Sequence, residues 1–167
     1  MENCMLFCEV RGGNKFQRNV AHGVIHHCVN SLIPDVTEID ICTQVAGLKK
    51  QWGSDLYAFC EETEYSKFLI HIERTLNPEM FVKYLCHEMV HVMQYTQGTL
   101  EEIHGSLVTG TVLWMGEEYT ENDYRYSDQP WEAQAFQMQE TLARDFFDNL
   151  GIGSTDSLSF KQIHSMM

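Results

Sequence analysis

Hydrophobic residues recur at helical spacing in three long segments. The first runs from about Asn14 to Ser31, and the third opens around Pro130 and continues until Gly151. Between them, Asn77 is suited to cap a helix, Pro78 suits its first position, and Gly98 provides a stop after about five turns. Apolar residues occupy most sides of this middle segment, which predicts a helix at the centre of the fold.

Strand signals lie between the helical segments. Alternating or β-branched residues predict strands at Val36–Thr43, Leu56–Cys60 and Phe68–Ile72, and a hairpin over Thr111–Tyr119 turning at Gly116-Glu117. A charged turn, residues 61–64, is expected to join the second strand to the third. Before Gly12 there is only a short apolar start. The pattern predicts one α+β domain over residues 1–167, with an N-terminal helix, a small mixed sheet of about three strands and a loosely packed tail at 152–167.

Composition narrows the classes of function. The chain has 167 residues, 44% of them hydrophobic, and a formal net charge of -13. Such a charge repels nucleic-acid backbones and anionic membranes, and it mildly favours neutral or basic substrates. The sequence shows no signal peptide or membrane-spanning stretch, so we expect a cytoplasmic protein, in the host cytoplasm if the protein is viral. Its six cysteines are then expected to be reduced thiols.

The middle helix carries two histidines four residues apart, with a carboxylate beside the first. Advancing 100° per residue from His87 places His91 near 40° and Glu88 near 100°. This arrangement holds zinc with the glutamate next to a metal-activated water, and it indicates a zinc hydrolase. The alternative is a chance match in a core helix, expected on the order of once in a hundred chains this short.

Catalytic zinc generally takes three protein ligands and leaves a fourth position open. A metzincin would have histidine at position 97 and glycine at position 94, but both are glutamine here. Downstream candidates for the third ligand are His104, Glu117, Glu118, Asp128 and Glu132. Glu132 is favoured because it follows the core anchor Trp131 in the first turn of the last helix. A helix N-terminal acid that stabilises the dipole is the competing interpretation.

Four segments resemble the small SprT-like zinc metallopeptidases, particularly compact versions encoded by bacteriophages. They are Phe68–Arg74, Cys86–Tyr95, the Trp114-Met115-Gly116 hairpin and Gln129–Ala135, and the resemblance spans about Val36 to Phe147. It implies a zincin-like fold of the minimal gluzincin type, with His87, His91 and Glu132 as zinc ligands and Glu88 as general base. Relatives that act on chromatin carry a further zinc ribbon, whereas no cysteine follows Cys86 here, which disfavours a DNA-linked role. Phe136 stands where larger gluzincins have an acid that supports a ligand histidine.

The resemblance implies a peptidase that acts on a peptide or protein substrate. Tyr124 and Tyr126, with Arg125 between them, are candidates for stabilising the oxyanion, and the strand Leu56–Cys60 is a candidate for binding an extended peptide. A zinc-binding module on the same fold that captures proteins without hydrolysing them is the main alternative. A second, structural zinc site is a weaker hypothesis based on residues with finger-like spacing: Cys4, Cys8, His22 and His26.

Overall fold

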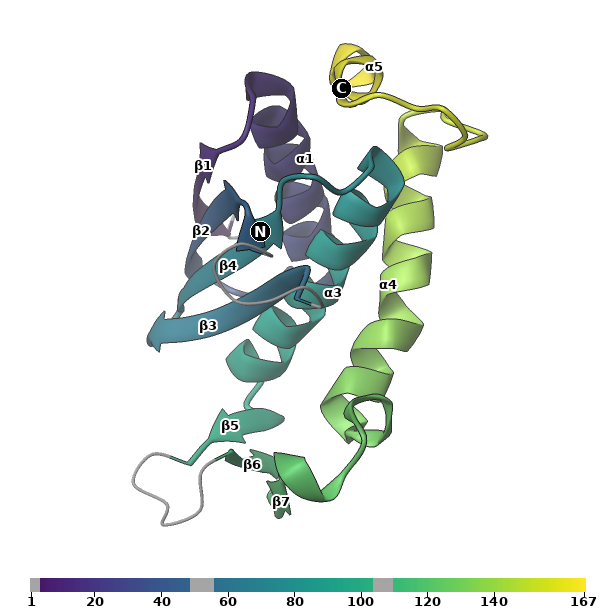
Figure 1. Cartoon of the computed structure of the whole chain (residues 1–167). Coiled ribbons are helices and arrows are strands. Elements are labelled where there is room, and N and C mark those ends of the chain that lie inside the picture. Colours follow the sequence, from purple (N-terminus) through teal and green to yellow (C-terminus); the bar gives the residue numbers. More distant parts are fainter. Residues whose placement is uncertain (1–3, 49–55, 104–109) are drawn as a thin grey trace.

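A computed structural model describes residues 4–48, 56–103 and 110–167 (Figure 1). The α-helices and β-strands in this part of the chain are, in order, β1 (Met5–Gly12), α1 (Lys15–Leu32), β2 (Glu38–Ala46), β3 (Ala58–Glu64), β4 (Lys67–Glu73), α3 (Pro78–Thr96), β5 (Leu100–Glu102), β6 (Thr111–Trp114), β7 (Glu117–Thr120), α4 (Pro130–Asn149) and α5 (Phe160–Met166). The mixed α+β class and the three long helices agree with the sequence prediction.

The main sheet has four strands in the order β1-β2-β4-β3. β1, β2 and β4 are parallel neighbours, and β3 pairs antiparallel with β4 at the edge of the sheet. Helix α1 connects β1 to β2, because parallel neighbours need a crossover rather than a tight turn. We expected three strands and did not predict β1. The predicted turn at residues 61–64 is also wrong, since these residues belong to β3 and the chain turns at Tyr65-Ser66 instead.

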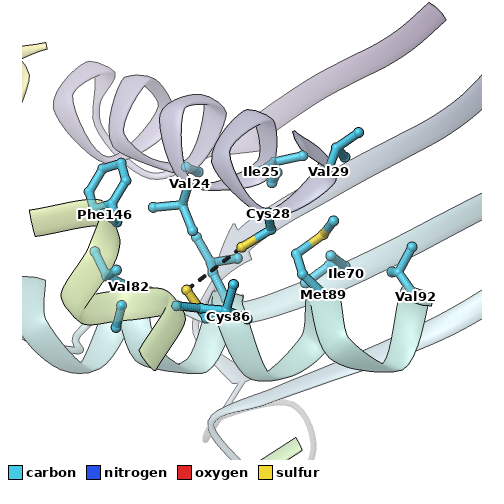
Figure 2. Close-up of a cluster of buried hydrophobic side chains, with 14 of the residues drawn as sticks. Val24, Ile25, Cys28, Val29, Ile70, Val82, Cys86, Met89, Val92 and Phe146 are labelled. Atoms are coloured by element: carbon cyan, nitrogen blue, oxygen red, sulfur yellow. Dashed lines mark hydrogen bonds between the residues drawn. The ribbon is translucent and has the colours of Figure 1, made fainter. Parts of the chain in front are cut away.

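Helices α1 and α3 cover one face of this sheet, and α4 packs on α3 (Figure 1). Twelve of the 19 residues of α3 are buried. Figure 2 shows the core where α1, α3, β4 and α4 meet, with the Sγ atoms of Cys28 and Cys86 3.7 Å apart as free thiols. Because α3 is enclosed on nearly all sides, its backbone gives the histidines a rigid support.

A second sheet, in the order β5-β6-β7, follows the end of α3. β5 was not predicted. The β6–β7 hairpin turns at Met115 and Gly116, both with positive φ, one residue earlier than predicted. Trp114 of this hairpin packs in a small cluster with Trp131, the second residue of α4. The hairpin thereby helps to fix the start of α4.

The C-terminal segment packs closely and is not the loose tail that we expected. Ile163 of α5 is fully buried, and the ring centroid of Phe160 lies 5.0 Å from that of Phe81 in α3. Gly23 of α1 allows the close approach, because a Cβ atom at this position would lie 2.3 Å from Cε of Met167. The C-terminal segment therefore packs on α1 and on the N-terminal end of α3.

Candidate metal centre

The two histidines lie one helical turn apart on the side of α3 that faces α4. His87 is 3% exposed and His91 is 7% exposed, and the T-shaped pair of rings has centroids 5.0 Å apart. The side chain of Asn77 accepts a hydrogen bond from the backbone N–H of Met80, and Pro78 occupies the first turn. The capping prediction is therefore confirmed. The cap fixes the start of the helix, and the four-residue spacing of the histidines puts both imidazoles on the side that faces α4.

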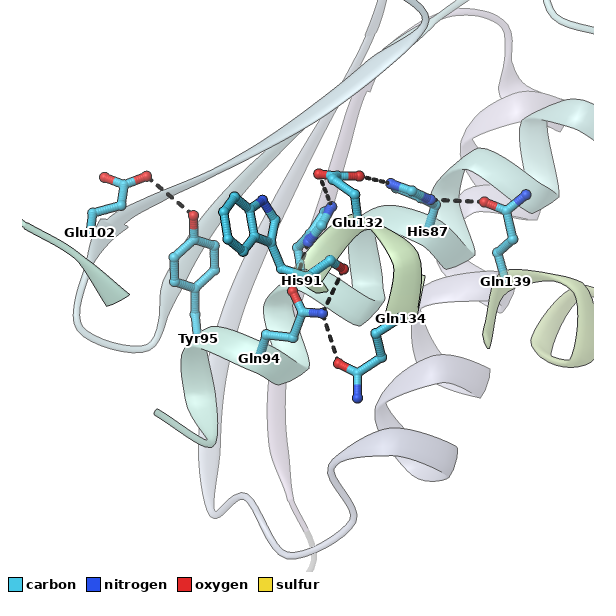
Figure 3. A network of polar contacts seen from close by, with 9 residues as sticks. His87, His91, Gln94, Tyr95, Glu102, Glu132, Gln134 and Gln139 are labelled. Atoms are coloured by element: carbon cyan, nitrogen blue, oxygen red, sulfur yellow. Dashed lines mark hydrogen bonds and ion pairs between the residues drawn. The ribbon is translucent and has the colours of Figure 1, made fainter. Parts of the chain in front are cut away.

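Glu132 comes from the first turn of α4 and meets both imidazoles (Figure 3). His87 Nε2 lies 2.9 Å from Glu132 Oε2, and His91 Nε2 lies 3.0 Å from Glu132 Oε1. One ligand atom from each of the three residues can be chosen so that all lie within 4.8 Å of one another. This is a group that could hold a metal ion, and it is the only such group of histidine, cysteine and acidic residues in the described segments.

The other candidates for the third ligand lie elsewhere. Glu117, Glu118 and Asp128 are exposed and do not belong to this group. His104 falls outside the described residues. Among the described candidates, the structure thus brings only Glu132 to the histidines.

Glutamine side chains hold the outward-facing nitrogen of each histidine (Figure 3). His87 Nδ1 lies 2.8 Å from Gln139 Oε1, and His91 Nδ1 lies 2.8 Å from Gln94 Oε1. Both contacts leave Nε2 directed to Glu132. Neither glutamine was predicted from the sequence. The ring of Phe136 also packs edge-on against the His87 ring, with centroids 4.8 Å apart.

Contacts within the group shift the pKa values of Glu132 and His91. Burial acts to raise the pKa of Glu132, but hydrogen bonds from His87 and His91 outweigh it and lower that pKa to about 2. Burial likewise acts to lower the pKa of His91, but the hydrogen bond to Glu132 and the negative charge of Glu88 raise it to about 9. The raised pKa of His91 and the lowered pKa of Glu132 both favour an ion pair between these two side chains.

Glu88 interacts electrostatically both with the ligand group and with Cys60 of β3. It is 4% exposed, and burial raises its pKa, opposed by the charges of His91 and His87. Its charge in turn raises the pKa of the Cys60 thiol on β3, after the larger effect of burial. The charge of Glu88 is therefore felt both by the paired histidines and by the edge strand of the main sheet.

The two candidate tyrosines have different surroundings. The hydroxyl group of Tyr126 interacts with Glu132 and helps to lower the pKa of that carboxyl group, although 57% of the Tyr126 residue is exposed. Tyr124 instead packs against Tyr119, with ring centroids 5.5 Å apart, and Arg125 is exposed. Only Tyr126 of these three residues interacts with the ligand group.

The finger-like residues do not form a second metal group. Cys4 and Cys8 pack against the main core, and burial raises the pKa of the Cys8 thiol to about 12. His22 and His26 stack on each other along α1, with ring centroids 6.4 Å apart. Within the described residues, these four side chains therefore do not form a group that could hold a structural zinc ion.

A groove of about 1110 Å³ lies beyond the C-terminal end of α3, between the β3–β4 turn and β5. Tyr95, one turn after His91, lines it and donates a hydrogen bond to Glu102 (Figure 3). The only cation in its lining is Lys67, whereas six carboxylate residues line it: Asp35, Glu38, Asp40, Glu62, Glu101 and Glu102. The groove is thus strongly acidic, and its lining reaches α3 at Tyr95, one helical turn after His91.

Comparison of the chain with protein-family models, with curated proteins and with solved structures found no match. Within the described residues, every helix is too short or too polar to cross a lipid bilayer.

Proposed function

We propose that the protein is a zinc-dependent metallopeptidase of zincin-like architecture. The observation that carries this proposal is the convergence of His87, His91 and Glu132 from two helices, with Glu88 alongside. Two imidazole nitrogens and one carboxylate oxygen form a set that zinc commonly takes in hydrolytic enzymes. The resemblance of the same segments to SprT-like peptidases supports the choice of peptide substrates.

The donor set fits zinc in its chemistry. Two imidazole nitrogens and one carboxylate oxygen, all within 4.8 Å of one another, would hold the ion. Three protein ligands would leave one position open, as catalytic rather than structural zinc sites do.

When bound, zinc would lower the pKa of a water molecule to about 7 and polarise the scissile carbonyl group. Glu88 then serves as general base, taking the proton of the attacking water and passing it to the leaving amine. Its raised pKa suits both steps, because the carboxylate must accept a proton near neutral pH and release it again. We assign the donor of a hydrogen bond to the oxyanion to Tyr126, and the interaction of its hydroxyl group with Glu132 supports this choice.

We further propose that substrates bind as an extended strand beside β3. An edge strand offers backbone donors and acceptors without demanding a particular sequence, and Glu88 lies next to this strand at Cys60. The acidic groove at the end of α3 would favour lysine or arginine residues in the part of the substrate that reaches it. The net charge of -13 acts in the same direction.

The decisive experiment compares the wild-type protein with Glu88→Gln. Purified wild-type protein should contain about one zinc ion per chain and hydrolyse unfolded or peptide substrates. Glu88→Gln should keep the zinc and lose about 10²- to 10⁴-fold in turnover, because it removes only the proton acceptor. Glu79→Gln, an exchange at the start of the same helix, is the matched control. Zinc binding without any wild-type hydrolysis would favour the non-hydrolytic binding module instead.

A further inference from the structure

Gln94 is a fully buried residue on α3, three residues after His91, and its side-chain amide makes three hydrogen bonds. Its Oε1 atom lies 2.8 Å from His91 Nδ1. Its Nε2 atom donates to the backbone carbonyl of Trp131 at 2.9 Å and to Oε1 of Gln134 at 2.8 Å. One side chain therefore connects a ligand of α3 with the first turn of α4 (Figure 3).

The carbonyl of Trp131 fixes which way this amide faces. A carbonyl oxygen can only accept a hydrogen bond, so the NH₂ group of Gln94 must face Trp131. Oxygen Oε1 is then left facing His91, and Nδ1 of His91 must carry the proton of that contact. When Nε2 gives up the proton that it donates to Glu132, as binding of a metal ion would require, the ring keeps its Nδ1 proton and presents a free electron pair on Nε2.

The same amide also holds the backbone beside the third ligand. Trp131 immediately precedes Glu132 in the first turn of α4. Gln139, the corresponding partner of His87, lacks this double connection within the described residues, where its NH₂ group donates to the exposed Glu140 at 3.4 Å. The two glutamines thus differ in what they fix: Gln139 orients one ring, whereas Gln94 orients a ring and joins two helices.

We propose that Gln94 is the positioning residue of the metal centre. It keeps His91 in the tautomer that presents Nε2 to the ion, and it holds Glu132 in register with α3. This inference rests on the proposed function where it concerns zinc, but the hydrogen bonds that it invokes join protein groups alone. The Nδ1–H of His91 can therefore be tested in protein from which metal has been removed.

The first test measures zinc affinity by competition with a chromogenic chelator. Gln94→Met keeps the length of the side chain and removes both hydrogen-bonding functions, so zinc should bind about 10- to 100-fold more weakly. Gln134→Met leaves the contact with Trp131 and should change affinity much less. Gln97→Met, at the exposed end of the same helix, should leave affinity unchanged.

The second test detects the imidazole protons by ¹H–¹⁵N NMR in metal-free and zinc-loaded protein. Wild-type protein should show a slowly exchanging Nδ1–H for His91 in both states. Gln94→Met should lose the His91 signal and keep that of His87, while Gln139→Met should do the reverse. A general loss of packing would not produce these opposite patterns, so the comparison separates positioning from a purely structural role.

The outcomes distinguish the two proposals. Wild-type protein that binds no zinc would refute the proposed function, while the metal-free NMR experiment would still judge Gln94. Absence of the His91 Nδ1–H from wild-type protein would overturn the assignment of Gln94, even if Gln94→Met failed to fold. Unchanged zinc affinity in folded Gln94→Met would overturn it as well.

Discussion

Nε2 of His87 lies 2.9 Å from Oε2 of Glu132, although 45 positions separate the two residues in the chain. The contact depends on α3 and α4 packing side by side with the first turn of α4 next to the middle of α3. We predict that Glu132→Ala lowers zinc affinity more than about 100-fold, since loss of a ligand should exceed the effect of losing a supporting residue. Glu140→Ala on the same helix, measured by the same chelator competition, should have no such effect. Normal zinc content in Glu132→Ala would show that another residue is the third ligand.

Removal of the metal should lower thermal stability without unfolding the chain. A ligand at 100 times its dissociation constant adds about 2.7 kcal/mol of stability, which for a domain of this size corresponds to about 5–10 °C in Tm. Melting curves with and without a chelator measure this difference. Glu132→Ala serves as the control, because its curve should be insensitive to chelator.

Tyr126→Phe tests the proposed oxyanion donor. The exchange removes one hydroxyl group and keeps the ring, which packs against Phe136 with centroids 5.9 Å apart. We expect kcat to fall about 10²- to 10³-fold while zinc affinity stays within a few-fold of wild type. Tyr124→Phe should be neutral, since Tyr124 contacts Tyr119 instead. Equal effects of the two exchanges would remove Tyr126 from the mechanism.

The acidic groove predicts a preference for basic substrates. The double variant Glu101→Gln/Glu102→Gln should lower kcat/KM for lysine- or arginine-containing peptides about 2- to 30-fold, as expected for the loss of two exposed charge contacts. Neutral peptides of the same length should be cleaved as before. Added salt should reduce the preference in the wild-type protein, because it screens exposed charges. If basic and neutral peptides lose activity equally, the groove does not select by charge.

Local signals made α3 and its histidines predictable. The cap at Asn77, Pro78 and the stop at Gly98 depend on neighbouring residues alone, and the observed helix, Pro78–Thr96, agrees with them. Glu132 was favoured for the same reason, as an acid next to a core anchor in a first turn. Its meeting with the histidines confirms that placement, whereas zinc and catalysis stay predictions.

Other features depended on residues distant in the chain. The inward-facing residues of β1 alternate regularly, but the outward-facing Met5 and Phe7 are apolar too, which hid the alternation. β3 carries glutamates because it pairs on one side only, so its charged residues looked like a turn. Gln94 and Gln139 contact partners 37 and 52 positions away, and glutamine at those places has no local signature.

The bridging carboxylate of Glu132 has a consequence for how the protein matures. A zinc finger cannot fold until its ion arrives, because little else holds it together. Here α3 is enclosed by its own core, and Glu132 contacts both imidazoles directly. If the protein binds zinc as we propose, synthesis of the folded chain and acquisition of its ion would be separate events, and metal supply would control when the protein becomes active.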